Sequence, residues 1–349
     1  MPAARPQLSS FEIACRLACR IASRVYGPGG RIPTKREFCT EFSSSNMTVQ
    51  KALSMLVEDG FLTTHGKAGT YVADVPPCFR RVGVLYPKAL TESFWYRSLH
   101  EAFAAATARR SIPLLEYAGC EADRPVQERL ADDLSMARLA GIVCTSPLME
   151  WCEAARASRT PPPAEIVFSG TTQAGTMATM RLLHNAARMT SLVRAQGIQR
   201  LAIIATYMQT SHMEGIIRDL SSAGAAVPQE WLHYVDPRSH QTARGIAHLL
   251  MTLPAARRPE IVYIADDHLV TSATQGLADA GIPVRVIAHG NIPYTRPVHV
   301  PVTFYGFDVR RIAEDALDCL AGQMRGQPFA AEMLAEAGFF AQDGTPIAV

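Results

Sequence analysis

Lysine is scarce in this chain of 349 residues, and its scarcity excludes one class of enzyme. The only lysines are Lys35, Lys51, Lys67 and Lys88, so the last 261 residues (349 − 88) contain none. An enzyme that holds pyridoxal phosphate or a carbonyl substrate as a Schiff base needs a lysine for that bond. The sequence also lacks a phosphate-binding glycine loop, an HExxH and a GxSxG. We therefore predict no catalytic residues and no cofactor.

Long apolar runs are also absent. No uninterrupted apolar stretch reaches the roughly 18 residues of a membrane-spanning helix, and the first ten residues lack the apolar segment of a secretory signal. We expect a cytoplasmic protein that has no membrane partner. The eight cysteines form no CxxC and no Cys/His ladder, which favours reduced, buried thiols over a metal site.

Charge is distributed unevenly between the two parts of the chain. The formal net charge is only +2, but the first 75 residues carry nine Lys or Arg against six Asp or Glu, a net of +3. The remainder therefore carries 2 − 3 = −1. A modestly basic N-terminal module on a near-neutral body fits a head that contacts phosphate backbones.

The N-terminal module has the pattern of a winged helix-turn-helix. A first helix is expected over residues 11–25, with Val25 on its apolar face, and glycines at 27–30 end it. Thr34 followed by Glu37 is a capping box that begins a second helix. Ser45 can cap a third helix, which Gly60 ends. Two short strands at 61–64 and 70–72 flank a glycine turn, as a hairpin wing requires.

This stretch resembles the DNA-binding domain of the GntR family of bacterial transcription regulators over roughly residues 8–74. The resemblance implies that the third helix enters the major groove of DNA and that the wing contacts its backbone. Residues 75–79, with two prolines, read as a short linker to the rest of the chain.

The body, residues 80–349, alternates apolar strands with helices of about 12 residues, which predicts parallel sheets. One series starts at a strand over 81–86 and includes a helix at 148–157. A second starts with a helix over 181–196 and a strand over 201–205. We therefore expect an α/β body of two doubly wound lobes with a cleft between them, behind an α+β winged helix-turn-helix.

The order of these segments resembles the effector-binding domain of the LacI/GalR family, which is related to periplasmic sugar-binding proteins. The markers are the strand at 82–86, the segment at 183–187, the strand at 201–204, the acidic strand end at 261–267 and the segment at 286–293. A GntR-type head on a LacI-type body is similar to the arrangement of bacterial arabinose repressors. The resemblance implies a small-molecule effector, such as a sugar, and a homodimer.

The exposed start of the third helix supplies the residues that read DNA. Asn46 and Gln50 carry amides that match adenine, where GntR members often have arginine, so we expect an operator that depends less on guanine. Cations at the start of the second helix and at the wing suit phosphates. The predicted DNA-binding residues are Lys35, Arg36, Ser45, Asn46, Met47, Thr48, Gln50, His65, Gly66 and Lys67.

Ligands of α/β lobes bind at the carboxyl ends of strands. The predicted ligand-binding residues are Phe94, Trp95, Tyr96, Thr145, Ser146, His212, Asp267 and Asn291. Asp267 matches the aspartate with which the resembling family binds its ligands. Two departures stand against the usual sugar site: His212 replaces an arginine, and Gly290 stands near a position that is often aspartate.

The sequence predicts a DNA-binding repressor on a near-palindromic double-stranded operator. Effector binding closes the cleft and changes the spacing of the two heads, and thereby the affinity for DNA. The alternative is a regulator whose body has lost ligand binding and serves only dimerisation or a protein partner.

Overall fold

The computed structural model describes residues 8–146, 162–169, 178–184, 186–207 and 210–348. It divides into two compact units. The first comprises residues 1–96, 103–181 and 314–333, and the second comprises residues 97–102, 182–313 and 334–349. The helix expected at 148–157 lies outside the described residues.

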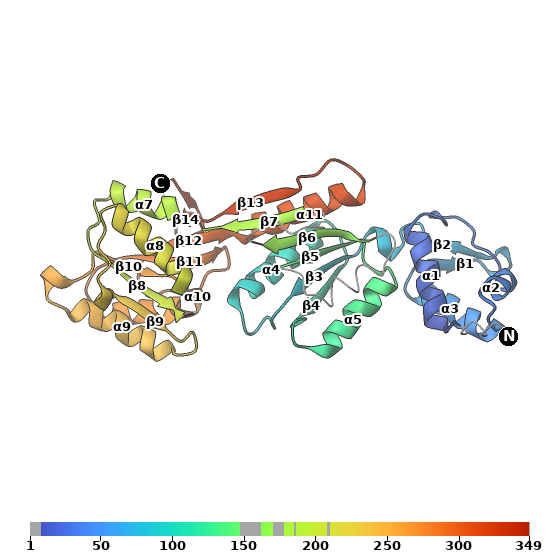
Figure 1. Ribbon diagram of the computed structural model, residues 1–349, viewed down its shortest axis with the longest axis horizontal. Coiled ribbons are helices and arrows are strands. Elements are labelled where there is room, and N and C mark those ends of the chain that lie inside the picture. The colour runs from blue at the N-terminus through green and yellow to red at the C-terminus, as the bar shows by residue number, and fades with distance from the viewer. Residues whose placement is uncertain (1–7, 147–161, 170–177, 185, 208–209, 349) are drawn as a thin grey trace, which may run out of the picture. The chain divides into compact units, whose positions relative to one another are not determined.

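A small head of three helices and a two-stranded hairpin begins the first unit (Figure 1). Its elements are α1 (Ser10–Ala22), α2 (Lys35–Phe42), α3 (Asn46–Glu58), β1 (Leu62–Thr64) and β2 (Thr70–Val72). The two strands pair antiparallel, with Leu62 opposite Val72. The winged helix-turn-helix predicted from the sequence is thereby confirmed.

Side-chain caps begin all three helices of the head. Thr34 and Glu37 form the predicted capping box: the Thr34 N–H donates to Glu37 at 2.6 Å, and the Glu37 N–H donates to the Thr34 hydroxyl. Ser45 begins α3 by accepting from the Thr48 N–H at 3.1 Å. Gly60, with φ of 82°, ends α3 as predicted. Each cap satisfies backbone groups that the helix itself leaves unpaired.

The first helix is shorter than expected. It ends at Ala22, with Ser23 as its C-cap, and Arg24 takes a left-handed conformation with φ of 59°. Val25, which was expected to line the apolar face, is 65% exposed. The turn carries Val25 off the helical path before its side chain can reach the core.

The first unit also contains a sheet in the order β13-β7-β6-β5-β3-β4. Neighbouring strands from β4 to β7 pair in parallel. Their bounds are β3 Val82–Tyr86, β4 Leu114–Ala118, β5 Gly141–Cys144, β6 Ala164–Ser169, β7 Ala178–Leu183 and β13 Glu332–Glu336. The helices that accompany this sheet are α4 (Phe94–Arg109), α5 (Arg124–Ser135) and α11 (Val309–Met324). Both α4 and α11 contain residues that cluster with the second unit.

The second unit is built around a sheet in the order β15-β14-β12-β11-β10-β8-β9. The strands from β9 to β12 are parallel, and β14 and β15 are antiparallel. The strands are β8 Leu201–Thr206, β9 Leu232–Val235, β10 Ile261–Ile264, β11 Arg285–Ile292, β12 Thr303–Asp308, β14 Gly338–Phe340 and β15 Pro346–Ile347. The helices are α7 (Ala186–Ala195), α8 (Thr210–Ser222), α9 (His240–Thr252) and α10 (Asp267–Ala280).

The parallel cores of the two sheets share one topology. Counted along the chain, each has its strands in the spatial order 2-1-3-4-5, which is that of a doubly wound fold. The chain therefore reverses its direction of winding between β3 and β5 in the first sheet, and between β8 and β10 in the second. The two doubly wound lobes predicted from the sequence are confirmed.

The helix expected over residues 181–196 is wrong at its start. Residues as far as Leu183 belong to β7, and α7 begins at Ala186. Arg181 stands opposite Ser169 in the ladder with β6, and its guanidinium binds Glu332 of β13 at 2.6 Å. Pairing with two neighbouring strands, which the sequence does not display, overrides the local helical pattern.

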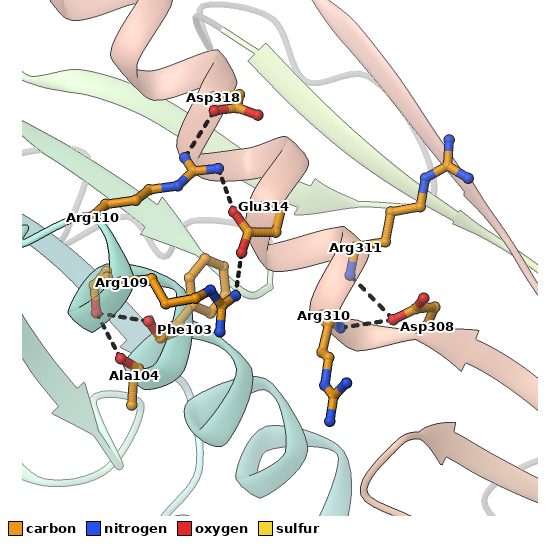
Figure 2. Close-up of polar contacts among 10 residues, drawn as sticks. Phe103, Ala104, Arg109, Arg110, Asp308, Arg310, Arg311, Glu314 and Asp318 are labelled. Carbon is orange, nitrogen blue, oxygen red and sulfur yellow. Dashed lines mark hydrogen bonds and ion pairs between the residues drawn. The ribbon is translucent and has the colours of Figure 1, made fainter. Parts of the chain in front are cut away.

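Ion pairs fasten α11 to α4 within the first unit (Figure 2). Arg109 of α4 and its C-cap Arg110 both bind Glu314, and Arg110 also binds Asp318 at 2.8 Å. At the start of α11, Asp308 accepts from the backbone N–H groups of Arg310 and Arg311 at 3.1 and 3.2 Å. The ion pairs fix α11 to the end of α4, about 205 positions earlier in the sequence.

Two glycines in neighbouring helices of the second unit have opposite surroundings. A Cβ at Gly276 of α10 would lie 2.1 Å from the carbonyl oxygen of Arg244 in α9, so the two backbones touch there. A Cβ at Gly245 of α9 would meet nothing within 4 Å.

We predict that Gly276→Ala lowers the free energy of unfolding by about 2–4 kcal/mol, because the methyl group must push α9 and α10 apart. Gly245→Ala is the matched control. It should raise stability by about 0.5–1 kcal/mol, since alanine costs less conformational entropy in an exposed helix position. Urea unfolding followed by circular dichroism measures both, and equal effects of the two substitutions would contradict the close approach.

Candidate DNA interface and effector site

Helix α3, which is the predicted recognition helix for DNA, is amphipathic. Its orientation in the head decides which of its side chains are exposed to solvent. Val49, Ala52, Leu53 and Leu56 are buried in the head core. On the other side, Asn46 and Gln50 are exposed, and Met47 is 82% exposed. A large apolar side chain with that exposure at the start of a helix is available to contact a thymine methyl group, and the amides beside it suit adenine edges.

Two of the predicted DNA-binding residues, Ser45 and Thr48, form the N-terminal cap of α3. The Ser45 and Thr48 hydroxyls lie 2.8 Å apart, and the Ser45 oxygen also accepts from the Thr48 backbone. Ser45 is exposed and Thr48 is half-buried. Their first role is therefore to begin the helix, and any contact with DNA has to share these hydroxyls.

Cationic side chains from α2 and the wing converge on one groove beside α3. A cavity of about 550 Å³ is lined by Arg31, Lys35, Gln50 and Lys67, among others. Lys35 lies in the first turn of α2, where the helix dipole also favours an anion. Arg36 is exposed on the next position. The groove thus combines positive charge with an amide of the recognition helix.

The wing tip holds the remaining predicted residues. Gly66 and Lys67 lie in a short 3-10 turn and are exposed. The His65 ring packs edge-on against Tyr71 at 5.3 Å, and its Nε2 lies 3.3 Å from the Thr63 hydroxyl. The histidine is held on the hairpin, while Lys67 is presented to solvent.

Arg31 belongs to this surface but was not predicted. It forms an isolated bridge with Tyr71, and its guanidinium lies where a Cβ at Gly69 would be, at 2.9 Å from Nε. Glycine at position 69, with φ of 116°, therefore leaves room for the arginine over the wing. The signal available in the sequence was a cation directly before the second helix.

At the carboxyl edge of the first sheet, the predicted residues follow β3 and β5, the strands between which the winding reverses. Tyr96 is half-buried and packs edge-on against Tyr86 at 6.3 Å, and burial is the main cause that raises the pKa of its phenol. Thr145 is buried, and both its N–H and its hydroxyl donate to the Leu85 carbonyl. The Thr145 hydroxyl proton therefore joins the two strands. Phe94, Trp95 and Ser146 are half-buried at the same edge.

At the carboxyl edge of the second sheet, polar side chains from β8, from β11 and from the start of α10 form one cluster. The Thr206 hydroxyl donates to Asp266 at 2.9 Å across the point where the winding reverses. Asn291 donates its amide to Asp267 at 3.1 Å. Asn291 is 0% exposed, and its Oδ1 has no hydrogen-bond partner among the described residues. Asp267 and Asn291, predicted separately, are brought together by the fold.

Two members of this cluster, Asp266 and His268, were not predicted. The His268 Nδ1 lies 2.9 Å from Asp266 and 3.1 Å from Asp267. The hydrogen bond to Asp266, then that to Asp267, raises the pKa of His268 to about 10. Burial opposes ionisation of Asp266, but its hydrogen bonds with His268 outweigh burial and lower its pKa. Asp266 also caps α10, a signal visible in the sequence as an aspartate before a helix.

Asp266, Asp267 and His268 are also donors of the kinds that bind a metal, and they lie within 4.8 Å of one another. The His268 Nδ1 faces both carboxylates, so a metal bound at that nitrogen would have to displace its proton. The arrangement is therefore an ion network in which one imidazolium offsets one of two carboxylate charges and leaves a net charge of −1.

His212 and Gly290 are the two positions at which the sequence departs from the family pattern, and the structure describes the surroundings of Gly290. His212 lies in the first turn of α8, and its side chain is outside the described residues. Gly290 lies in β11, and a Cβ there would come within 2.6 Å of the Phe304 ring. The neighbouring Gly306 would place its Cβ 1.9 Å from the Gly290 carbonyl oxygen. An aspartate cannot stand at position 290 while Phe304 and β12 keep their places.

The head and the two sheets define a class of protein: a winged helix-turn-helix joined to a body with two doubly wound parallel sheets. Residues 10–72 match the family described as "Bacterial regulatory proteins, gntR family". The N-terminal head is therefore a GntR-family helix-turn-helix domain.

Curated relatives are similar to this chain chiefly in the head. An uncharacterised HTH-type transcriptional regulator, YurK of Bacillus subtilis, is 30% identical over 108 residues, which are 31% of this chain and 45% of YurK. A probable fructoselysine utilization operon transcriptional repressor of Escherichia coli is 42% identical over 66 residues, 19% of this chain and 27% of that repressor. The chain thus spans less than half the length of either relative.

The body is similar in fold to regulators of the LacI family. A LacI family transcriptional regulator from Arthrobacter, solved in complex with lactose, superposes with a TM-score of 0.56 at 14% identity. The match covers 76% of this chain and 99% of that one. At this identity the likeness shows the fold alone. Among the described residues, no helix is long and apolar enough to cross a membrane.

We predict that His268 remains protonated at pH 8 in the folded protein, because its raised pKa of about 10 lies above the ordinary value of 6.5. The contribution of the ion network to stability should be complete below about pH 6.5 and should decline as the pH rises toward 10. His268 is partly exposed, so solvent screening makes the decline shallower than the shift alone implies.

An NMR titration of the His268 ring protons measures this pKa directly, and His268→Gln identifies the resonance. Asp266→Asn should lower the pKa of His268 by removing its largest cause. The stability difference between wild type and His268→Gln should shrink between pH 6 and pH 10. A His268 ring that titrates near its ordinary value would contradict the network.

Proposed function

We propose that the protein is a transcriptional repressor whose GntR-type head binds double-stranded DNA and whose body binds a small molecule that changes the affinity for DNA. The observation that carries the proposal is the exposed start of α3, where Asn46, Met47 and Gln50 project from a helix whose other face is buried. The match of the head to the gntR family and the LacI-type fold of the body support the same conclusion.

In this proposal the interface has two parts with different tasks. Lys35, Arg36 and Lys67 contact phosphates and hold the head on the duplex. Asn46, Met47 and Gln50 contact base edges in the major groove and give sequence preference. One head covers few base pairs, so a homodimer on a near-palindromic operator supplies the affinity that a repressor needs. Such a regulator acts in the cytoplasm.

We propose that residues 1–74 form the DNA-binding head, that residues 75–79 form the linker and that residues 80–349 form the body. The head carries the net charge of +3, and the body is near neutral. This separation allows DNA attraction to be confined to the head, while the body remains free to bind an uncharged ligand.

We assign the effector to the carboxyl edges of the two sheets, where doubly wound folds bind ligands. The polar cluster of Asp267 and Asn291 lies at one such edge, and Tyr96, Thr145 and Ser146 lie at the other. Carboxylate and amide groups suit the hydroxyls of a sugar, and aromatic rings suit its apolar faces. The lactose bound to the Arthrobacter regulator is consistent with this ligand class.

The alternative is a body that binds no small molecule and serves dimerisation or a protein partner. The burial of Asn291 and the contact of His268 with Asp267 favour it, because the Asn291 amide N–H and the Asp267 carboxylate are already engaged within the protein. No enzymatic step is proposed in either case.

We expect Lys35→Ala and Lys67→Ala each to weaken binding to all duplexes. Each should also reduce the slope of log Kd against log salt by about one for each phosphate that the lysine neutralises in the wild type. The duplex is first recovered with wild-type protein from a randomised library at low salt. Lys88→Ala, which removes an exposed lysine of the body, is the matched control and should leave the slope unchanged.

Asn46→Arg tests base reading rather than phosphate contact. Its guanidinium suits the two acceptors of guanine, so repeated selection should recover more guanine at one position of each half-site. An unchanged motif would place Asn46 outside the base-reading surface.

A ligand from a panel of sugars and related metabolites should raise the melting temperature of the wild-type protein by binding the folded state. Asp267→Asn should abolish that shift. Asp279→Asn, in the last turns of the same helix α10, is the control and should retain it. A panel in which nothing shifts the wild type would favour the alternative of a body without a ligand.

A further inference from the structure

The turn between α5 and β5 is part of the apolar core of the head. Met136 and Ala137 are both 0% exposed and belong to the same cluster as Leu17 of α1 and Leu56 of α3. These two residues come from the sheet-containing part of the first unit, about sixty positions beyond the linker. The head is therefore packed against the first sheet's own helix as well as joined to it through residues 75–79.

Arg138, the next residue, ties this turn to the recognition helix. Its Nε and Nη2 donate to Asp59 Oδ2 at 2.9 and 2.7 Å, and its Nη1 donates to Asp133 Oδ1 at 3.0 Å. Asp59 is the C-cap of α3. Because the arginine side chain is only 20% exposed, the pair is better shielded from solvent than an ordinary surface ion pair.

The same network continues into the sheet. Asp133, in the last turn of α5, accepts from the buried Tyr117 hydroxyl of β4 at 2.6 Å. Leu130 and Leu134 of α5 are fully buried in the cluster that covers this sheet. The C-terminal half of the helix is thus anchored and cannot move independently of the strands beneath it.

The N-terminal end of α5 lies at the opposite edge of the sheet. The helix begins at its cap Asp123, directly after β4, where the candidate ligand residues of the first unit gather. In the loop before it, Cys120 donates to the Tyr86 carbonyl, and Tyr86 packs against Tyr96. One rigid helix therefore joins the candidate effector edge to the recognition helix.

We propose that α5, with the turn of Met136, Ala137 and Arg138 that follows it, is the element by which the body sets the orientation of the recognition helix, and that Arg138 is its positioning residue. A short linker alone would leave the head free to turn. The buried turn and the two-way contacts of Arg138 remove that freedom, so a displacement of α5 together with the strands beneath it reorients α3. This inference rests on the proposed function for its consequence on DNA, but its structural part is independent of DNA.

Hydrogen exchange of the full-length protein, followed by mass spectrometry, tests the docking without DNA. In Arg138→Ala, exchange at residues 73–81 and 134–140 should rise about tenfold, while the β10 and β11 peptides stay unchanged. Arg138→Lys, which keeps the charge and one donor, should recover most of the protection. Arg124→Ala removes an exposed arginine from the first turn of α5 and is the control, with no change expected.

Binding to DNA tests the orientation. On duplexes selected by the wild type, Arg138→Ala should keep its affinity for a single half-site within about twofold. Its affinity for two half-sites at the native spacing should fall about tenfold, and it should accept spacings changed by one base pair. A merely structural role for Arg138 would not alter the spacing preference. Arg138→Lys should restore it.

Unchanged exchange in Arg138→Ala would overturn the docking. Increased exchange with unchanged affinity and spacing preference would overturn the positioning role. If the wild type itself binds no duplex, the proposed function fails, and the exchange experiment still decides whether α5 holds the head.

Discussion

The burial of one face of α3 is the constraint on which the rest of the head depends. Val49, Ala52 and Leu56 cannot leave the core without exposing apolar surface, so the opposite face, with Met47, must remain in solvent. The Ser45 cap fixes where the helix starts, and therefore which residues occupy its first exposed turn. A surface that reads DNA thus follows from packing and capping that serve stability first.

The body contains two sheets of the same topology. Both sheets wind in the same order, and in both a polar or aromatic group of side chains lies where the winding reverses. The two edges differ in chemistry: one is dominated by phenols, and the other by two carboxylates that share one contact partner, His268. Such a network holds Asp267 and Asn291 rigidly in place. The same contacts that prepare these groups for a ligand also reduce the hydrogen bonds they have left to offer.

Two ion networks in the protein have different structural roles because they lie in different places. Around His268, opposite charges meet within one edge of one sheet. Around Arg138, they connect the C-cap of the recognition helix to a helix of the body. The first network organises a local site. The second joins parts of the chain that lie 79 positions apart, and so it can couple the movement of one to that of the other.

Features that depend on neighbours along the chain could be predicted from the sequence. The capping box of Thr34, the cap at Ser45 and the alternation of parallel strands with helices are of this kind, because each is a short-range pattern. Other features required the folded chain: residues near Arg181 extend β7, Val25 leaves its helix, and Asn291 is buried beside Asp267. Strand pairing, burial and the meeting of Arg138 with Asp59 join residues distant in sequence, and no local pattern encodes which partner a side chain will find.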